Sequence, residues 1–261
     1  MTSSAIDNPV IFFDSGIGGL PYLELFRNKA PGENVIFFAD SENFPYGVKS
    51  EKQIRSFLYD SIFRIIDKFN PKLIVIACNT ASVTGLAFLR KKFAVPFVGV
   101  VPAVKPAAEK NKKGRIGILA TKKTINGPYL KKLISDFASG CKVEKYGDPD
   151  IVTMIEYERN DIKPAVIEKI TKFYSQRPVE YLVLACTHFI FISDDLQKAL
   201  GEKIEIIDSR QGVINQALRI ISYNNAKKGE AYFYTSGKEK DFPRLKNKAE
   251  MFDLKFMGNL D

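Results

Sequence analysis

Two cysteines end two similar stretches of this sequence, one in each half of the chain. Cys78 follows the apolar run Leu73–Ala77, and Cys186 follows the apolar run Tyr181–Ala185. Two small or polar residues and a helical pattern come after each cysteine, so we expect both thiols at strand ends, where open α/β sheets place their ligand sites. The positive end of a helix favours the thiolate form of a nearby cysteine. A thiolate and a thiol on opposite faces of one carbon can act as base and acid, which is the chemistry that inverts a stereocentre.

Two further ionisable residues lie at expected strand ends. His188 is the single histidine of the chain and follows Cys186 by two residues. Asp14 ends the run Val10–Phe13 and precedes the glycine-rich turn Ser15–Gly19. This turn does not fit the dinucleotide pattern G-x-G-x-x-G, because Pro21 stands where the third glycine is required. We expect its backbone N–H groups to bind a small carboxylate; the alternative role of Asp14 is that of a helix N-cap.

Other residue patterns leave alternatives open. Taken alone, the loop Pro45–Gly47 is typical of a turn. Cys141 lies beside a glycine in a polar connection without a matched partner, and we interpret it as structural. Zinc chemistry stays open, because Cys78, Cys186 and His188 could be three ligands with water as the fourth, as in a hydrolase or lyase. A non-catalytic protein that binds acidic ligands is a third reading.

Composition is that of an ordinary soluble globular protein. The 261 residues include 45% hydrophobic and 26% charged residues, and no apolar run approaches the ~18–20 residues of a membrane span. Met1–Asn8 lacks the pattern of a secretory signal, so we expect a cytoplasmic protein without membrane contact. Three cysteines form no disulfide framework and fit a reducing compartment. The net charge of +9 comes from dispersed lysine pairs, without an aromatic-basic motif, so we expect no nucleic-acid partner.

Short apolar runs alternate with helical patterns along most of the chain, which predicts an α/β protein with mostly parallel sheets. The expected strands are Val10–Phe13, Val35–Ala39, Leu73–Ala77, Phe97–Val101, Ile116–Ala120, Val143–Tyr146, Tyr181–Ala185, Ile204–Asp208 and, in the tail, Tyr232–Thr235. Between them, Gln53–Phe69 has apolar residues at helical spacing and is ended by Pro71.

Internal duplication organises these elements. The strand Val10–Phe13 and the following Asp14 match Ile116–Leu119 and the following Ala120–Lys122, with Thr121 at nearly the offset that separates the two cysteines. We therefore expect two similar doubly wound domains, one formed by residues 1–99 and 209–261 and the other by residues 100–208, with the active site in the cleft between them.

Together these segments closely resemble one known family, the glutamate racemases of the aspartate/glutamate racemase superfamily. The resemblance spans nearly the whole chain in order and is carried by Phe13–Leu20, Pro45–Gly47, Ala77–Ser82, Ala185–Phe189 and Ile207–Ser209. It implies a racemase that uses two cysteines and neither an organic cofactor nor a metal, and that supplies D-glutamate for peptidoglycan synthesis. Aspartate or another acidic amino acid remains an alternative substrate, and assembly into a homodimer is left open.

The resemblance also implies roles for individual residues. Cys78 would remove the α-proton of D-glutamate with help from Asp14, and Cys186 that of L-glutamate with help from His188 and Glu156. The substrate, L- or D-glutamate, would be bound by Ser15, Pro45, Tyr46, Gly47, Asn79, Thr80, Thr121 and Thr187.

Overall fold

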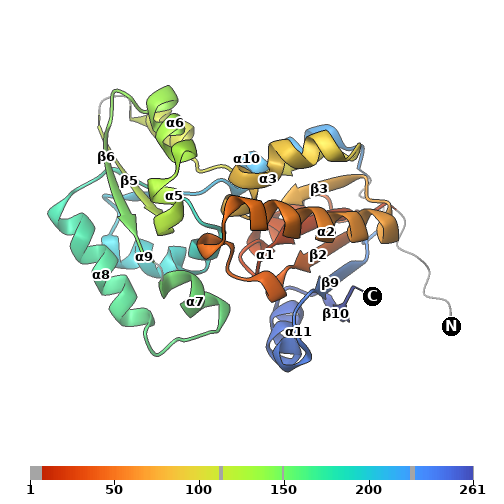
Figure 1. Cartoon of the computed structure of the whole chain (residues 1–261). Coiled ribbons are helices and arrows are strands. Elements are labelled where there is room, and N and C mark those ends of the chain that lie inside the picture. Colours follow the sequence, from red (N-terminus) through yellow and green to blue (C-terminus); the bar gives the residue numbers. More distant parts are fainter. Residues whose placement is uncertain (1–7, 112–113, 149, 224–226, 261) are drawn as a thin grey trace. The chain divides into compact units, whose positions relative to one another are not determined.

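The computed structural model describes residues 8–111, 114–148, 150–223 and 227–260. These residues divide into two compact units, one that runs up to Val100 and resumes at Arg210, and one that consists of Val101–Ser209. Each unit is a parallel sheet with helices packed on it (Figure 1). The expectation of two parallel-sheet α/β units is confirmed.

The first unit is built on six parallel strands in the order β10-β9-β2-β1-β3-β4. Its strands are β1 (Val10–Asp14), β2 (Val35–Ala39), β3 (Leu73–Ile76), β4 (Phe97–Gly99), β9 (Ala231–Thr235) and β10 (Lys255–Asn259). Its helices are α1 (Leu20–Lys29), α2 (Glu51–Phe69), α3 (Asn79–Lys92), α10 (Arg210–Ile220) and α11 (Phe242–Met251), with 3-10 turns η1 (Ser41–Asn43), η2 (Tyr46–Val48) and η4 (Glu239–Asp241).

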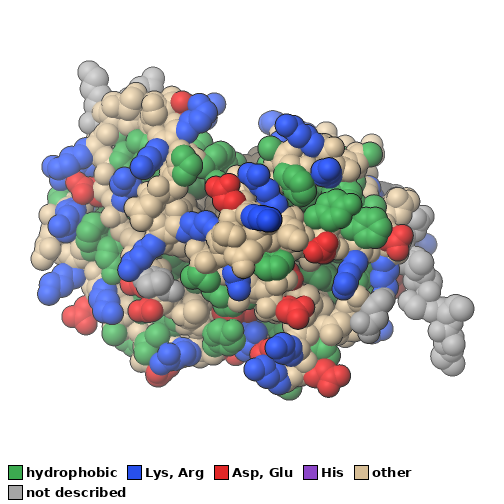
Figure 2. Space-filling model, viewed as in Figure 1, with side chains coloured by type: hydrophobic (Ala, Val, Ile, Leu, Met, Phe, Trp, Pro, Cys, Tyr) green, Lys and Arg blue, Asp and Glu red, His purple; other side chains and the backbone are tan. Residues whose placement is uncertain are grey.

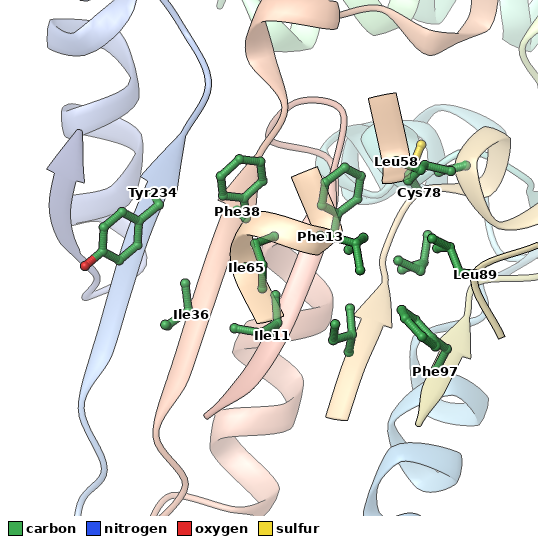
Figure 3. Packing of buried hydrophobic residues seen from close by; sticks show 14 of the residues in the cluster. Ile11, Phe13, Ile36, Phe38, Leu58, Ile65, Cys78, Leu89, Phe97 and Tyr234 are labelled. Atoms are coloured by element: carbon green, nitrogen blue, oxygen red, sulfur yellow. The ribbon is translucent and has the colours of Figure 1, made fainter. Parts of the chain in front are cut away.

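Strand β1 shows why the central strands of this sheet are apolar throughout. Ile11 and Phe13 point to one face, where they belong to a cluster with residues of α2 and α3 (Figure 3). Phe12 points to the other face and contacts Phe26 of α1, with 5.4 Å between ring centroids. Because both faces are covered, the strand has no solvent-exposed side, and its five residues are all buried.

Helix α2 has clear signals at both ends. Ser50 accepts a hydrogen bond from the backbone N–H of Gln53, and the Gln53 side chain accepts from the backbone of Ser50, which is a capping box. This cap starts the helix at Glu51, two residues earlier than predicted. Asn70 ends the helix in a left-handed conformation ahead of Pro71, so the predicted end is confirmed.

The second unit is built on four parallel strands in the order β6-β5-β7-β8. Its strands are β5 (Arg115–Ala120), β6 (Lys142–Gly147), β7 (Tyr181–Leu184) and β8 (Glu205–Ile207). Its helices are α4 (Val104–Lys110), α5 (Lys122–Asn126), α6 (Pro128–Phe137), α7 (Asp150–Glu156), α8 (Lys163–Gln176) and α9 (Ser193–Leu200), with the 3-10 helix η3 (Thr187–Ile192).

The two sheets share one strand order. In chain order within each unit, the pattern β2-β1-β3-β4 of the first sheet recurs as β6-β5-β7-β8 in the second. Matching backbone bonds follow: the Ala77 N–H donates to the Phe13 carbonyl at 2.7 Å, and the Ala185 N–H donates to the Leu119 carbonyl at 2.8 Å. Each of these alanines directly precedes one of the two cysteines, so the duplication inferred from the sequence extends to the backbone that holds the thiols.

The C-terminal segment completes the first sheet. The predicted tail strand is confirmed as β9, which pairs with β2. Strand β10, which pairs with β9 at the sheet edge, was not predicted. Its sequence Lys255–Asn259 contains a glycine at a register shift and alternates in burial without a continuous apolar run, so it carries a weak strand signal.

Surface charge is dispersed in the view of Figure 2, where Lys and Arg side chains are spread over both units among acidic and apolar side chains. This agrees with the expectation that the positive charge is dispersed along the chain. Within the described part of the chain, no helix is both long enough and apolar enough to cross a membrane.

Two glycines of the first unit give opposite expectations for stability. A Cβ at Gly19 would lie 2.7 Å from the Ala77 Cβ and 3.1 Å from its carbonyl oxygen, whereas a Cβ at Gly212 in α10 would meet no atom within 4 Å. We expect Gly19→Ala to lower the free energy of unfolding by about 1–3 kcal/mol through overpacking. Gly212→Ala should raise it by up to about 1 kcal/mol through helix propensity. Urea unfolding checks both, and a stable Gly19→Ala protein would contradict the close packing described here.

Candidate active site

Cys78 lies at the carboxyl edge of the first sheet. It follows β3 by two residues and is the N-cap of α3, with extended backbone dihedrals of −134° and 121°. Its side chain is at the border of the apolar cluster, beside Leu58 in Figure 3, and is 6% exposed. The thiol is thus at a strand end and a helix start, as the sequence predicted.

Asp14 and Ser15 approach this thiol from the neighbouring strand β1. The Ser15 Oγ lies 3.8 Å from the Cys78 Sγ and 3.2 Å from the Asp14 Oδ1, to which it donates. The Gly16 N–H also donates to the Asp14 Oδ1, at 3.3 Å. The N-cap of α1 is Gly19, so the alternative role of Asp14 as that N-cap is wrong. The carboxylate, hydroxyl and thiol form one buried polar group.

Tyr46 lies in the 3-10 turn η2 of the same unit as Cys78. Its hydroxyl donates to the Asp40 Oδ2 at 2.5 Å, and the ring is buried in the cluster that contains Cys78. Burial, and next the negative charge of Asp40, raise the pKa of Tyr46 well above its usual range, with smaller contributions from Cys78 and Asp14. Tyr46 is therefore held as a neutral phenol within electrostatic reach of the thiol.

The flanks of Tyr46 are more open. Pro45 and Gly47 are both partly buried, and a Cβ added at Gly47 would meet no atom within 4 Å. Packing within the protein therefore does not require glycine at this position.

Asn79 and Thr80 form the first turn of α3, directly after Cys78. Asn79 is 4% exposed, yet its Oδ1 has no hydrogen-bond partner among the described protein atoms. Buried acceptors are normally paired, so this oxygen is suited to receive a donor from a bound molecule.

Cys186 occupies the equivalent position in the second unit. It follows β7 by two residues, has extended dihedrals of −147° and 135°, and is buried. The sequence predicted that a helix begins here, and the structure has the 3-10 helix η3, which continues into α9. The i→i+3 hydrogen bonds of a 3-10 helix make this turn tighter than an α-helical turn. Thr187 and His188, its first two residues, are both buried.

His188 pairs with Glu156 in this unit. The His188 Nε2 lies 3.0 Å from the Glu156 Oε2, and the two side chains are 3% and 1% exposed. Glu156 ends α7, which packs against η3. When the Glu156 carboxylate is ionised it only accepts hydrogen bonds, and Nε2 then carries the shared proton. The structure thus joins two residues that the sequence related only by resemblance.

Thr121 follows β5 on the strand next to β7, at the same edge of the second sheet as Cys186. Its side chain caps α5, accepting from the Thr124 N–H at 3.3 Å, and its Oγ1 lies 3.1 Å from the Thr124 Oγ1.

Asp40 is the residue that sequence reasoning missed. It directly follows β2, one residue beyond the position that pairs with Asp14 at the end of β1, so its place after an apolar run was the available signal. Cys141 donates to the Asn111 carbonyl at 3.1 Å and directly precedes β6, at the opposite edge of the second sheet from Cys186. Among the described residues, no three His, Cys, Asp or Glu side chains are grouped as metal ligands.

Two parallel α/β units with the same core strand order, each with a thiol at the carboxyl edge of its sheet, define a duplicated α/β scaffold that carries two equivalent cysteines. Comparison with known proteins places the chain more closely. The model of the family described as Asp/Glu/Hydantoin racemase matches residues 22–217, and the chain belongs to this family.

Several relatives and solved structures are similar over nearly the whole chain. Glutamate racemase of Treponema pallidum is 35% identical over 256 residues, covering 96% of each chain. The structure of Escherichia coli glutamate racemase with L-glutamate and the activator UDP-MurNAc-Ala has a TM-score of 0.86 at 29% identity, over 97% of this chain and 98% of that one. The structure of the Francisella tularensis enzyme with D-glutamate has a TM-score of 0.78 at 25% identity, over 97% and 98%.

Asp40 should give the stability of the first unit a distinct pH dependence. Burial raises the pKa of this carboxyl above its ordinary 3.8, although hydrogen bonds from Ser236, Tyr46 and Asn43 oppose the shift. The folded protein therefore holds the proton more tightly, and the contribution of Asp40 to stability is lost as pH rises from about 4 through the raised pKa. Relative to Asp40→Asn, the unchanged protein should lose unfolding free energy over this window, by at most about 1.4 kcal/mol per pH unit.

Urea unfolding between pH 4 and pH 7 measures this difference. The same replacement at the exposed Asp67 of α2 controls for the loss of one surface charge. A difference that grows in the opposite direction, with the unchanged protein gaining on Asp40→Asn as pH rises, would show that the hydrogen bonds outweigh burial.

Proposed function

We propose that this protein is a glutamate racemase that interconverts L- and D-glutamate by proton transfer between Cys78 and Cys186 and the α-carbon. One observation carries the proposal: each thiol lies two residues beyond the equivalent strand of the same sheet order, at the start of the following helix. Membership in the racemase family and the glutamate racemases among its relatives support the substrate.

The reaction needs two groups of opposite role. The thiolate of one cysteine removes the α-proton from one face of glutamate, and the thiol of the other gives a proton to the opposite face, which inverts the centre. The pair of electrons left on the α-carbon is delocalised into the α-carboxylate, where N–H and O–H donors stabilise the developing charge. After one turnover the two cysteines have exchanged roles, and the enzyme is ready for the reverse direction.

The first unit supplies a helper for Cys78. We assign this role to Asp14, because the Ser15 hydroxyl lies between its carboxylate and the Cys78 sulfur, 3.2 Å from one and 3.8 Å from the other. A hydroxyl can donate a hydrogen bond to the carboxylate and accept one from the thiol, so Ser15 can couple Asp14 to Cys78. Removal of a proton from D-glutamate belongs to this side.

The second unit supplies a different helper for Cys186. We assign it to His188, two residues further along η3, with Glu156 holding the imidazole through the contact at 3.0 Å. A buried carboxylate stabilises the imidazolium that forms when His188 takes up a proton. Removal of a proton from L-glutamate belongs to this side.

Substrate binding is assigned to both units. Ser15, Asn79 and the loop Pro45–Gly47 of the first unit and Thr121 and Thr187 of the second would hold glutamate, together with Thr80. Asn79 Oδ1 lacks a partner among the described protein atoms, and the α-ammonium group of an amino acid is a donor that fits it. The open space at Gly47 leaves room for a ligand next to the backbone. We place the enzyme in the cytoplasm, where its D-glutamate would enter peptidoglycan synthesis.

Removal of either thiol should abolish racemisation. We expect Cys78→Ala and Cys186→Ala each to lower the rate of racemisation by about 10²-fold to 10⁴-fold or more, because each variant lacks one of the two acid–base groups. Elimination from a β-substituted glutamate needs one base only, so each variant should still process one enantiomer: Cys186→Ala the D form and Cys78→Ala the L form. Circular dichroism follows racemisation of L-glutamate, and release of the leaving group follows elimination.

Cys141→Ala serves as the matched control, since Cys141 is a partly buried cysteine that donates to a backbone carbonyl. It should keep full activity. Near-normal racemisation by either of the other two variants would rule out the two-thiol mechanism.

The helper assignments predict opposite asymmetries. His188→Asn should slow kcat from L- to D-glutamate more than the reverse, and Asp14→Asn should slow kcat from D to L more, each by about tenfold or more within the range of general acid–base effects. The equilibrium constant between the enantiomers is one, so kcat/KM must be equal in the two directions. A difference between the two kcat values is therefore accompanied by an equal ratio between the two KM values. Progress curves from both enantiomers measure the four constants for each variant.

Thermal unfolding of each variant separates catalysis from stability, because His188→Asn also leaves the buried Glu156 without its 3.0 Å contact. Equal losses in both directions for both variants would refute the assignment of helpers to sides while leaving the two thiols in place.

A further inference from the structure

A chain of hydrogen bonds connects the C-terminal segment to the candidate substrate loop of the first unit. The Asp40 Oδ1 accepts from the Ser236 Oγ at 2.6 Å, and its Oδ2 accepts from the Tyr46 hydroxyl at 2.5 Å. Asn43 Nδ2 donates to both carboxylate oxygens, at 3.0 and 3.1 Å. Asp40 is 1% exposed, so its carboxylate is satisfied almost entirely by these side chains.

Ser236 is held in place by strand pairing. The Ser236 N–H donates to the Ala39 carbonyl at 3.0 Å, directly after β9 has paired with β2. Its Oγ also accepts from the Glu42 N–H at 3.2 Å while it donates to Asp40. Both roles of the hydroxyl are used, so its hydrogen is aimed at the carboxylate.

Tyr46 links this network to the thiol. Its ring and Cys78 belong to one buried cluster, and the charges of Cys78 and Asp14 act on its hydroxyl. Because the phenolic hydrogen is bound by Asp40, the phenolic oxygen keeps its lone pairs for a donor on the other side. Gly47, with open space at its Cα, follows directly.

We propose that Asp40 is a positioning residue of the racemase site, and that Ser236 orients it so that Tyr46 and the adjoining loop are fixed beside Cys78 to bind the substrate. This inference rests on the proposed function. It gives the C-terminal segment, which carries neither thiol, a part in substrate binding. Asp40 and Ser236 act through Tyr46, so their loss should weaken binding rather than slow proton transfer.

A cavity borders the network, so the loss of the Ser236 hydroxyl disturbs little else. Asp40, Asn43 and Ser236 border a cavity of about 270 Å³ whose other lining residues include Asp60, Arg64 and Asn259. Removing the Ser236 hydroxyl therefore enlarges an existing polar space and does not open a void in the apolar core.

The experiment is a double-mutant cycle between Ser236→Ala and Tyr46→Phe, read as kcat and KM for L- and D-glutamate. Each single variant should raise KM by about tenfold, as expected for the loss of a hydrogen bond to a charged group, with kcat nearly unchanged. The double variant should have the KM of Tyr46→Phe alone, because Ser236 has no route to the substrate once the phenolic hydroxyl is gone. Ser236→Thr keeps the hydroxyl and should restore the KM.

Ser41→Ala is the matched control. Ser41 lies in η1, next to Asp40, and its buried Oγ has no hydrogen-bond partner among the described residues, so this variant should keep the unchanged KM. Additive effects of Ser236→Ala and Tyr46→Phe, an unchanged KM in Ser236→Ala, or an equal rise in Ser41→Ala would each overturn the inference.

The outcomes separate this inference from the proposed function. Turnover of glutamate by the unchanged protein without coupling in the cycle refutes the positioning role alone. If the unchanged protein binds glutamate without turning it over, calorimetric Kd values replace KM, and coupling among them supports positioning while the racemase proposal fails. Neither turnover nor binding of glutamate would overturn both.

Discussion

A strand covered by helices on both faces can carry polar chemistry only at its ends. In β1, Ile11 and Phe13 pack on one side and Phe12 on the other, so Asp14 is the first position at which a carboxylate is compatible with the sheet. The same constraint acts on β3 and β7, whose apolar residues run up to the alanine before each thiol. Asp14, Asp40, Cys78 and Cys186 all stand at carboxyl ends for this reason.

The duplication preserves the scaffold but not the groups that surround the thiols. Equivalent backbone bonds at Ala77 and Ala185 hold both cysteines in extended conformation ahead of a helix. Around Cys78 the polar partners come from the end of β1, whereas in the second unit the acid comes from α7 and reaches His188 on η3. A scaffold constrained by strand pairing has thus been combined with ionisable groups from elements that differ between the halves.

Much of this could be predicted from the sequence, because apolar runs ended by a polar residue specify buried parallel strands and their carboxyl ends. The equivalent positions of the two cysteines at strand ends followed from that pattern alone. The contact between Glu156 and His188 could not, since it joins residues from separate elements and depends on how α7 packs against η3. Asp40 was missed because a lone aspartate after an apolar run is equally typical of a turn, and its bond to Ser236 forms only when β9 pairs with β2.

The insertion of the second unit between β4 and α10 has a consequence for synthesis on the ribosome. All four strands of the second sheet leave the ribosome before β9 and β10 do, because residues from Arg210 onward are made last. The second unit can therefore fold while the first still lacks β9 and β10. Until Ser236 has been translated, Asp40 lacks one of its partners, and a nascent chain cut short before that residue retains both cysteines without the finished support of Tyr46.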